Sequence, residues 1–282
     1  MCSRVCVLLD RYSKFVYAMI TAAIVARKCN SRVVNRNSSR TKSVVTAAGL
    51  LLIVASLTVV LLMVFQQQQN DTSPSHSDIF SAKYARDDWR GGSGPGSFVE
   101  NTVPYRQLLQ RIFDDDRFQS FVDLGCGDFQ IMKLINVPAG KTYRGIDVVR
   151  HVIEQNERLY GGRPNYQFSL IDDLRDLKLG SRLLQGVDML IVKDVLIHLS
   201  NSDIQYFVDQ ILPNAKFALI TNDYTDDGDY RNDNIPTGTF RPVDLTYPPF
   251  NLKGMQLVLR YSYDSGNTIK RVYLYTNPAF II

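Results

Sequence analysis

Residues Phe121 to Gln130 read FVDLGCGDFQ, a short apolar run that carries one acid and is followed by two glycines around a cysteine. The run Phe121–Leu124 predicts a buried strand, and Phe129–Ile135 predicts the start of a helix. Glycine has no Cβ and adopts positive φ easily, so Gly125 and Gly127 indicate a tight turn or a place where a ligand lies against the backbone. Ligands of open parallel sheets bind at the carboxyl ends of the strands, where this turn falls.

Short apolar runs alternate with helical patterns after this stretch. Further strands are predicted at Thr142–Ile146, Tyr166–Leu170, Asp188–Val192 and Phe217–Thr221, and helices at Val149–Leu159 and Asp203–Leu212. This alternation predicts a doubly wound α/β fold, with a parallel sheet and helices on both faces. Near the C-terminus, Gln256–Tyr261 and Arg271–Tyr275 flank the turn sequence DSGN, which predicts an antiparallel hairpin at one edge.

A second acid, Asp147, closes the next predicted strand, 24 residues after Asp123. A carboxylate at this place can accept hydrogen bonds from both hydroxyls of a ribose. A dinucleotide-binding turn would read GxGxxG, whereas here Gln130 stands at the third glycine and Asp128 adds negative charge where phosphates would lie. The residues favour a ligand with a ribose and a positive charge but no phosphate, properties that S-adenosylmethionine combines.

Two segments resemble motifs of the class I S-adenosylmethionine-dependent methyltransferases. Asp123–Phe129 resembles the first motif of that family, and Lys193–Leu199 (KDVLIHL) resembles the segment after its fourth strand. The resemblance covers Trp89 to the C-terminus and implies a mostly parallel seven-stranded sheet with an antiparallel C-terminal hairpin. It implies S-adenosyl-L-methionine as the cofactor. Phe129 stands where a glycine is usual, so the first helix is expected to sit differently.

The resemblance also implies which residues surround the cofactor. Asp123, Gly125, Cys126 and Gly127 are expected around the methionine portion, Asp147 on the ribose, Asp172 or Asp173 on the adenine amino group, and Lys193 in the wall of the methyl-transfer cleft.

Transfer of a methyl group to a hydroxyl requires a base that removes the hydroxyl proton. His198 is the first candidate, because the pKa of imidazole suits neutral pH, although a structural histidine is the alternative. Asp194 and Asp223 are the reserve candidates. The four cysteines and three histidines show no paired zinc-ligand spacing, so no metal site is predicted.

Residues 43–65 contain no charged side chain and predict one transmembrane helix. The preceding residues 1–42 are basic, and no Lys or Arg follows the apolar segment before Lys83. By the positive-inside rule the tail is cytosolic and the C-terminal domain lumenal, as in the Golgi or ER. A mitochondrial or plastid transit peptide is the alternative interpretation of residues 1–42.

The remaining organisation follows from composition. Residues 66–88 are predicted to be a flexible stalk, with an N-glycosylation pattern at Asn70, and residues 89–282 to be the methyltransferase domain. The glycine-rich Trp89–Ser97 (WRGGSGPGS) is either a mobile lid or a linker.

Charge and sequence pattern together lead to a function. Residues 1–65 hold nine Lys or Arg and one acid, which leaves 23 basic and 27 acidic residues in the rest and argues against a nucleic-acid substrate. The predicted function is S-adenosylmethionine-dependent O-methylation of a glycan or small metabolite. The alternatives are a non-catalytic binding module with the cofactor fold, an organelle methyltransferase for a lipid or quinone-type acceptor, and a nicotinamide-dependent dehydrogenase.

Overall fold

The computed structural model describes residues 56, 58–60, 74–225, 231–263 and 268–280. The chain divides into two compact units, Met1–Ser73 and Pro74–Ile282, and the fold given below is that of the second. The basic tail 1–42, Asn70, the turn at 264–267 and all but four residues of the predicted transmembrane segment 43–65 lie outside the described residues. Within the described part, no helix combines the length and apolar character needed to cross a membrane.

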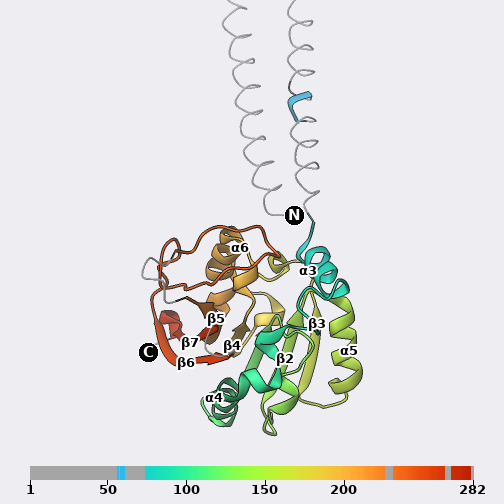
Figure 1. Cartoon of the computed structure of the whole chain (residues 1–282), viewed down its shortest axis with the longest axis vertical. Helices are drawn as coiled ribbons and strands as arrows, with labels where there is room; N and C mark the ends of the chain where they lie inside the picture. The colour runs from blue at the N-terminus through green and yellow to red at the C-terminus, as the bar shows by residue number, and fades with distance from the viewer. Residues whose placement is uncertain (1–55, 57, 61–73, 226–230, 264–267, 281–282) are drawn as a thin grey trace, which may run out of the picture. The chain divides into compact units, whose positions relative to one another are not determined.

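In the described part of the second unit, seven strands form one sheet in the order β3-β2-β1-β4-β5-β7-β6 (Figure 1). Strands β1 to β5 are parallel, whereas β7 runs antiparallel to both β5 and β6. The strands are β1 (Ser120–Leu124), β2 (Thr142–Asp147), β3 (Tyr166–Leu170), β4 (Val187–Lys193), β5 (Ala215–Tyr224), β6 (Met255–Tyr263) and β7 (Thr268–Thr276). The expected mostly parallel seven-stranded sheet with its antiparallel C-terminal hairpin is confirmed. The strands β1, β2 and β3 follow one another toward one edge of the sheet, and β4 and β5 lie on the other side of β1, so the strand order reverses between β1 and β4.

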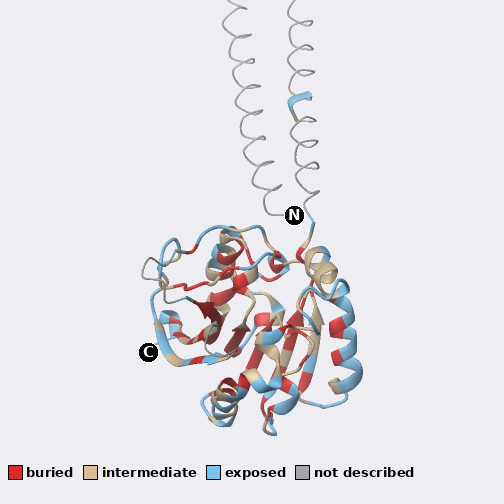
Figure 2. Cartoon of the chain, viewed as in Figure 1, coloured by how far each residue is buried: buried red, intermediate tan, exposed pale blue. Residues whose placement is uncertain are grey.

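Helices cover both faces of this sheet. The helices are α3 (His76–Ala85), α4 (Val103–Asp114), α5 (Arg150–Tyr160) and α6 (Asn201–Tyr206), which continues as the π-helix η7 (Phe207–Ile211). Short 3₁₀ helices are η1 (Pro95–Ser97), η2 (Val99–Thr102), η3 (Met132–Leu134), η4 (Leu174–Asp176), η5 (Arg182–Leu184), η6 (Leu196–His198), η8 (Leu212–Asn214) and η10 (Pro278–Phe280). One apolar cluster joins α4 to one face of the central strands, and a second joins α6 to the other face. Figure 2 shows the buried residues concentrated along the strands between these helices.

Helix α4 shows why the sequence packs in this way. Its buried residues Tyr105, Leu109 and Phe113 are spaced four apart, so they form one face of the helix. The ring of Phe113 stacks on Phe121 of β1 with 4.0 Å between centroids. Burial of a side chain of this size stabilises the fold by about 1.5–3 kcal/mol.

The expectation of a helix starting at Phe129 was wrong. Phe129 has φ +66°, which a right-handed helix cannot accommodate, and only the 3₁₀ turn η3 follows β1. The ring of Phe129 is 1% exposed and contacts the rings of Tyr143, Tyr160 and Tyr166. Packing of this aromatic cluster therefore fixes the backbone at the position where the related motif usually has a glycine.

The predicted stalk over residues 66–88 also needs correction. The compact unit begins at Pro74, and α3 lies within the stretch expected to be flexible. Ser75 starts this helix through a capping box, because its side chain accepts a hydrogen bond from the Asp78 amide and the Asp78 carboxylate accepts one from the Ser75 amide. Residues 74–88 are thus part of the folded unit.

Candidate functional site

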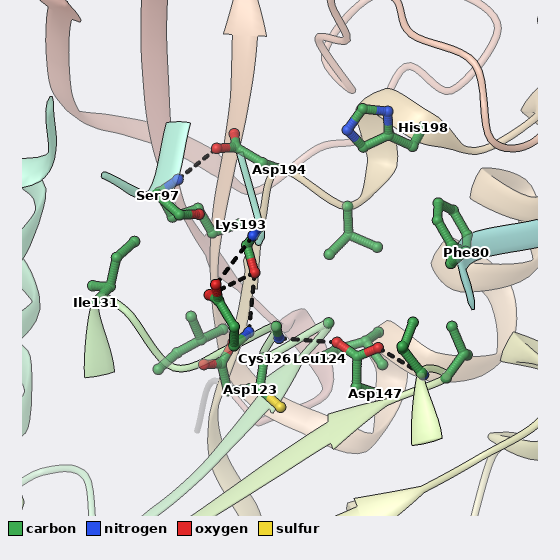
Figure 3. A pocket seen from close by; sticks show the side chains of 18 of the residues that line it. Phe80, Ser97, Asp123, Leu124, Cys126, Ile131, Asp147, Lys193, Asp194 and His198 are labelled. Carbon is green, nitrogen blue, oxygen red and sulfur yellow. Dashed lines mark hydrogen bonds and ion pairs between the residues drawn. The ribbon is translucent and has the colours of Figure 1, made fainter. Parts of the chain in front are cut away.

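The main pocket of the described unit lies at the carboxyl ends of β1, β2 and β4, where the fold predicts a ligand site. Asp123 and Gly125–Gly127 of β1 and its turn, Asp147 of β2, and Lys193, Asp194 and His198 at the end of β4 all line it. Figure 3 shows Asp123 and Asp147 on one side of the pocket and Asp194 and His198 on the opposite side. These predicted residues, distant in the sequence, share one pocket.

The turn after β1 strongly favours glycine at two positions. Gly125 has φ +74° and Gly127 has φ +56°, a region that other residues seldom adopt. A Cβ on Gly125 would come 2.4 Å from a methyl group of Val195, and one on Gly127 would come 2.3 Å from Oγ of Ser93. The glycines therefore let the turn approach the segment after β4 and the loop that contains Ser93.

Asp147 is held by backbone amides and keeps acceptor capacity. Its Oδ2 accepts a hydrogen bond from the Gly127 amide at 2.9 Å, and its Oδ1 accepts one from the Val149 amide at 3.0 Å. The Val148 amide is a third backbone donor to this carboxylate, so about one of its roughly four acceptor sites remains for a hydroxyl donor of a ligand. Burial raises the pKa of Asp147, although these backbone hydrogen bonds oppose the shift.

Asp123 is the second buried acid in the pocket. It is 7% exposed, and its Oδ2 accepts a hydrogen bond from the Tyr143 hydroxyl at 2.8 Å. Burial raises the pKa of Asp123 to about 7, the charge of Asp147 adds to the rise, and the Tyr143 hydroxyl opposes it. Two buried carboxylates of raised pKa make this half of the pocket favourable for a cation.

Four charged side chains form a buried network at the other half of the pocket. Asp194 Oδ2 contacts Lys193 Nζ at 2.5 Å, and its Oδ1 contacts Lys270 Nζ at 2.7 Å. Lys270 Nζ also lies 2.6 Å from Oδ1 of Asp223. Burial acts to raise the pKa of Asp194, but the two lysines outweigh it and lower the pKa to about 2. Asp194 therefore stays ionised at neutral pH and is a poor proton acceptor.

Asp223 is placed differently from the other two candidate bases. It does not line the pocket, and its carboxylate is paired with Lys270. Burial and the nearby charge of Asp194 raise its pKa. Asp223 in β5 therefore serves as an ion-pair partner of Lys270 and is not placed to contact a ligand in the pocket.

His198 lines the pocket, and the protonation state of its ring suits a general base. Its Nδ1 lies 2.8 Å from the carbonyl oxygen of Thr239, which can only accept, so Nδ1 carries the hydrogen and Nε2 keeps a free lone pair. Burial lowers the pKa of His198, so the ring is neutral at pH 7. The ring lies between Trp89, with 5.4 Å between centroids, and Phe240, with 6.0 Å.

Three of the predicted cofactor residues do not present their side chains to the pocket as expected. Asp172 is exposed, and neither it nor Asp173 lines the pocket, whereas their apolar neighbours Ile171 and Leu174 do. A contact with an adenine amino group stays a prediction for both acids. The Cys126 thiol packs close to Gly145 of β2, and burial raises its pKa, so it remains a protonated thiol that fills space behind the turn.

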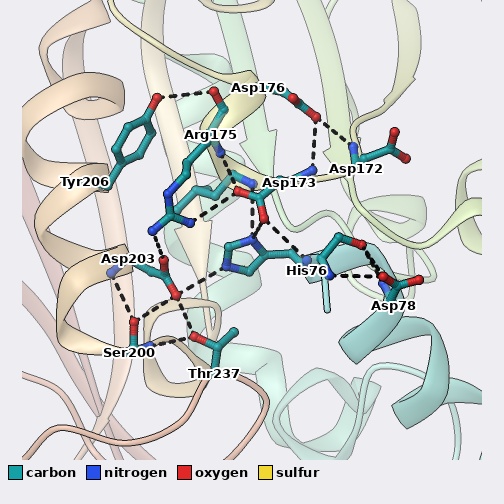
Figure 4. A network of polar contacts seen from close by, with 12 residues as sticks. His76, Asp78, Asp172, Asp173, Arg175, Asp176, Ser200, Asp203, Tyr206 and Thr237 are labelled. Atoms are coloured by element: carbon teal, nitrogen blue, oxygen red, sulfur yellow. Dashed lines mark hydrogen bonds and ion pairs between the residues drawn. The ribbon is translucent and has the colours of Figure 1, made fainter. Parts of the chain in front are cut away.

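Asp173 instead belongs to a polar network around His76 (Figure 4). Nδ1 of His76 contacts Asp173 at 2.5 Å, and its Nε2 lies 3.4 Å from Oδ2 of Asp203. Burial acts to lower the pKa of His76, but hydrogen bonds to the two acids outweigh it and raise the pKa to about 9. A protonated histidine thus connects the start of α3 to the segment after β3 and to α6.

The sequence did not reveal that residues 74–97 form part of the pocket. This stretch, here named the cover segment, contains α3 and the glycine-rich loop after it. It contributes to the pocket wall through His76, Phe80, Tyr84, Trp89, Ser93 and Ser97. The capping-box pattern Ser75-His-Ser-Asp78 is the signal that could have indicated a folded helix here.

No protein-family model and no curated protein matches the sequence. The structure is similar to the methyltransferase domain of bacterial CtHen1, with 16% identity, a TM-score of 0.46, and coverage of 61% of this chain and 97% of that one. It is also similar to the N-methyltransferase NodS from Bradyrhizobium japonicum in complex with S-adenosyl-L-homocysteine, with 12% identity, a TM-score of 0.46 and coverage of 62% and 86%.

A third similar structure is the N-terminal domain of EvdMO1 with SAH bound, at 11% identity, a TM-score of 0.46 and coverage of 64% of this chain and 82% of that one. At these identities and TM-scores the similarities do not assign an activity or a substrate to this chain.

Proposed function

We propose that the chain is an S-adenosylmethionine-dependent methyltransferase that binds its cofactor in this pocket. The observation that supports the proposal is the pair of buried acids, Asp123 and Asp147, beside a turn in which Gly125 and Gly127 have positive φ. Asp147 has about one acceptor site left for a ribose hydroxyl, and Asp123 offers negative charge to the cationic methionine end. The apolar residues Val148, Ile171 and Leu174 provide the wall expected beside an adenine ring.

The same turn argues against a dinucleotide. Phosphates of such ligands bind at a helix N-terminus, but only η3 follows β1 here. The Asp128 carboxylate also lines the pocket, where it accepts hydrogen bonds from the Ser93 amide at 3.2 Å and the Ser93 hydroxyl at 2.8 Å. Its negative charge would repel a pyrophosphate at this place.

We assign the proton-accepting role to His198. When bound, S-adenosylmethionine supplies an electrophilic methyl group, and methylation of a hydroxyl releases one proton. His198 is neutral, lines the pocket and keeps Nε2 free, whereas Asp194 is ion-paired and Asp223 lies outside the pocket. The cover segment, which contributes six side chains to the pocket wall, would limit the access of water.

The acceptor is proposed to be a hydroxyl of a glycan or small metabolite. A neutral histidine is the support for oxygen as the acceptor atom, because a hydroxyl needs a base of about neutral pKa. The sequence supports a glycan in the lumen as the acceptor. Residues 43–65 would be a single-pass signal anchor with the N-terminus in the cytosol, which would place the C-terminal domain in the lumen. Glycosylation at Asn70, detected as a mass shift that Asn70→Gln abolishes, would test this topology.

Calorimetry on the full-length chain in detergent micelles tests the cofactor. We expect heat of binding with S-adenosylmethionine and S-adenosylhomocysteine, and none with NAD. Binding of NAD alone would refute the proposal in favour of a dehydrogenase. Labelled methyl donor added to cell fractions then identifies the acceptor, and the variant His198→Gln should bind cofactor normally but transfer no label. Cofactor binding without transfer to any fraction would favour the non-catalytic binding module.

A further inference from the structure

The cover segment rests over the pocket with little apolar packing of its own. Within residues 74–97 only His76 and Gly94 are buried, and the apolar side chains of α3 are half-buried. Six of its side chains nevertheless line the pocket. Phe80 packs against one of the core clusters, and polar contacts to the pocket rim hold the glycine-rich loop of the segment.

These contacts attach the glycine-rich loop to both sides of the pocket. Ser93 exchanges hydrogen bonds with Asp128, since its hydroxyl donates to the carboxylate at 2.8 Å and accepts from the Asp128 amide at 3.0 Å. On the other side, Lys193 Nζ donates to the Gly96 carbonyl oxygen at 2.7 Å. A Cβ on Gly92 would overlap the Asp128 carboxylate, so the loop reaches this position only with glycine there.

The fixed loop brings the single tryptophan of the chain to His198. Trp89 lies 5.4 Å from His198, 5.3 Å from Tyr84 and 6.2 Å from Phe80 between ring centroids. His198 has its Nδ1 bonded to Thr239, but a single hydrogen bond leaves the ring free to swing about it. The neighbouring rings of Trp89 and Phe240 restrict that motion, and Phe240 is 56% exposed.

We infer that Trp89 is a positioning residue: its indole ring, held in place by the Ser93–Asp128 contact, orients the imidazole of His198 and shields it from water so that Nε2 faces the pocket. A catalytic role for the contact between Trp89 and His198 rests on the proposed function. The contact itself is a property of the unliganded chain, so it can be tested without cofactor or acceptor.

The test is a titration of the histidines by NMR in the full-length chain. The three histidines, labelled at Cε1, give three resonances, and His198→Gln identifies the one from His198. Burial lowers the pKa of His198, supported by the charges of Lys270 and Lys83 and opposed by Asp194. Trp89→Leu changes none of these charged groups, so an upward shift of the pKa toward the ordinary value would report the lost shielding.

Companion variants separate positioning from general damage to the fold. Trp89→Phe keeps an aromatic ring and should restore most of the wild-type pKa, whereas Ser93→Ala should raise the His198 pKa as Trp89→Leu does, because it detaches the loop. Phe280→Leu, a matched change at an exposed aromatic residue outside the pocket, should leave it unchanged.

The outcomes decide between the possibilities. A His198 pKa that is the same in the wild type, Trp89→Leu and Ser93→Ala would overturn the inference. A shift in every variant, including Phe280→Leu, would also overturn it, because it would reflect loosening of the whole unit. Calorimetry with S-adenosylhomocysteine is run on the same samples: absence of binding together with the expected histidine shifts would refute the proposed function and leave the positioning contact standing.

Discussion

Replacement of Asp123 by Asn should stabilise the protein at neutral and basic pH. A carboxyl whose pKa is raised on folding binds its proton more tightly in the folded state, so its contribution to stability is present at acid pH. That contribution is lost as pH rises from the unfolded pKa of 3.8 to the folded pKa of about 7. Above pH 7 the folded protein holds a buried charge that the unfolded chain would keep in water.

The size of the effect follows from this shift. About three pKa units at about 1.4 kcal/mol each give about 4 kcal/mol of destabilisation by the ionised Asp123 at pH 8. Asparagine has no charge to bury, and its carbonyl oxygen can still accept the Tyr143 hydroxyl that now lies 2.8 Å from Asp123. The gain from Asp123→Asn should therefore be close to zero at pH 4 and approach about 4 kcal/mol at pH 8.

Urea unfolding of the full-length chain measures this gain. Trp89 is the single tryptophan, so its fluorescence reports on the unit that contains the pocket. Wild type and Asp123→Asn are compared at several pH values between 4 and 8, with Asp116→Asn as a control for the loss of an exposed carboxylate. If the difference between Asp123→Asn and the wild type does not grow with pH, the reasoning about the buried charge is refuted.

The other predictions concern the same unit. Affinity for S-adenosylmethionine should rise as pH increases toward 7, because the cation binds the ionised form of Asp123. Calorimetry in buffers of different ionisation heat should therefore detect the release of up to one proton on binding. A binding heat that does not depend on the buffer would contradict this prediction. His76→Asn should lower the free energy of unfolding by about 3 kcal/mol below pH 6.5. This difference should decrease as pH rises through about 9, because the wild-type histidine then loses its proton. Denaturation curves at several pH values measure the difference. Gly127→Ala should lower the free energy of unfolding by at least about 1–3 kcal/mol because of the positive φ, and its Cβ should displace Ser93. A lower melting temperature and stronger quenching of Trp89 fluorescence by acrylamide would show these two effects. Wild-type values in both measurements would argue against a left-handed backbone at Gly127.

The strands could be predicted from the sequence because their burial leaves a direct pattern. β3 was predicted at its observed bounds, and the predicted β2 differs by one residue, because in each strand apolar residues alternate with polar or small ones. The missing helix after β1 could not be predicted in this way. Phe129 takes a positive φ because Tyr143, Tyr160 and Tyr166 surround its ring, and these contacts come from three other elements.

The residues of the site that lie at the ends of parallel strands could be predicted from the sequence. Asp123, Gly125, Gly127 and Asp147 lie at strand ends that the parallel arrangement brings together, as expected. The pairing of Asp194 with Lys270 spans 76 positions of the chain and depends on the antiparallel register of β7, which no local pattern encodes.

The same pairing gives the C-terminal hairpin a role beyond closing the sheet. Lys270 is 1% exposed and neutralises two carboxylates that sit on neighbouring strands. A fragment that stops before β7 would keep every motif residue yet leave Asp194 and Asp223 facing each other without their shared counter-ion. A truncated or alternatively spliced product of this kind should therefore be unable to assemble the centre, even though its sequence would still look complete.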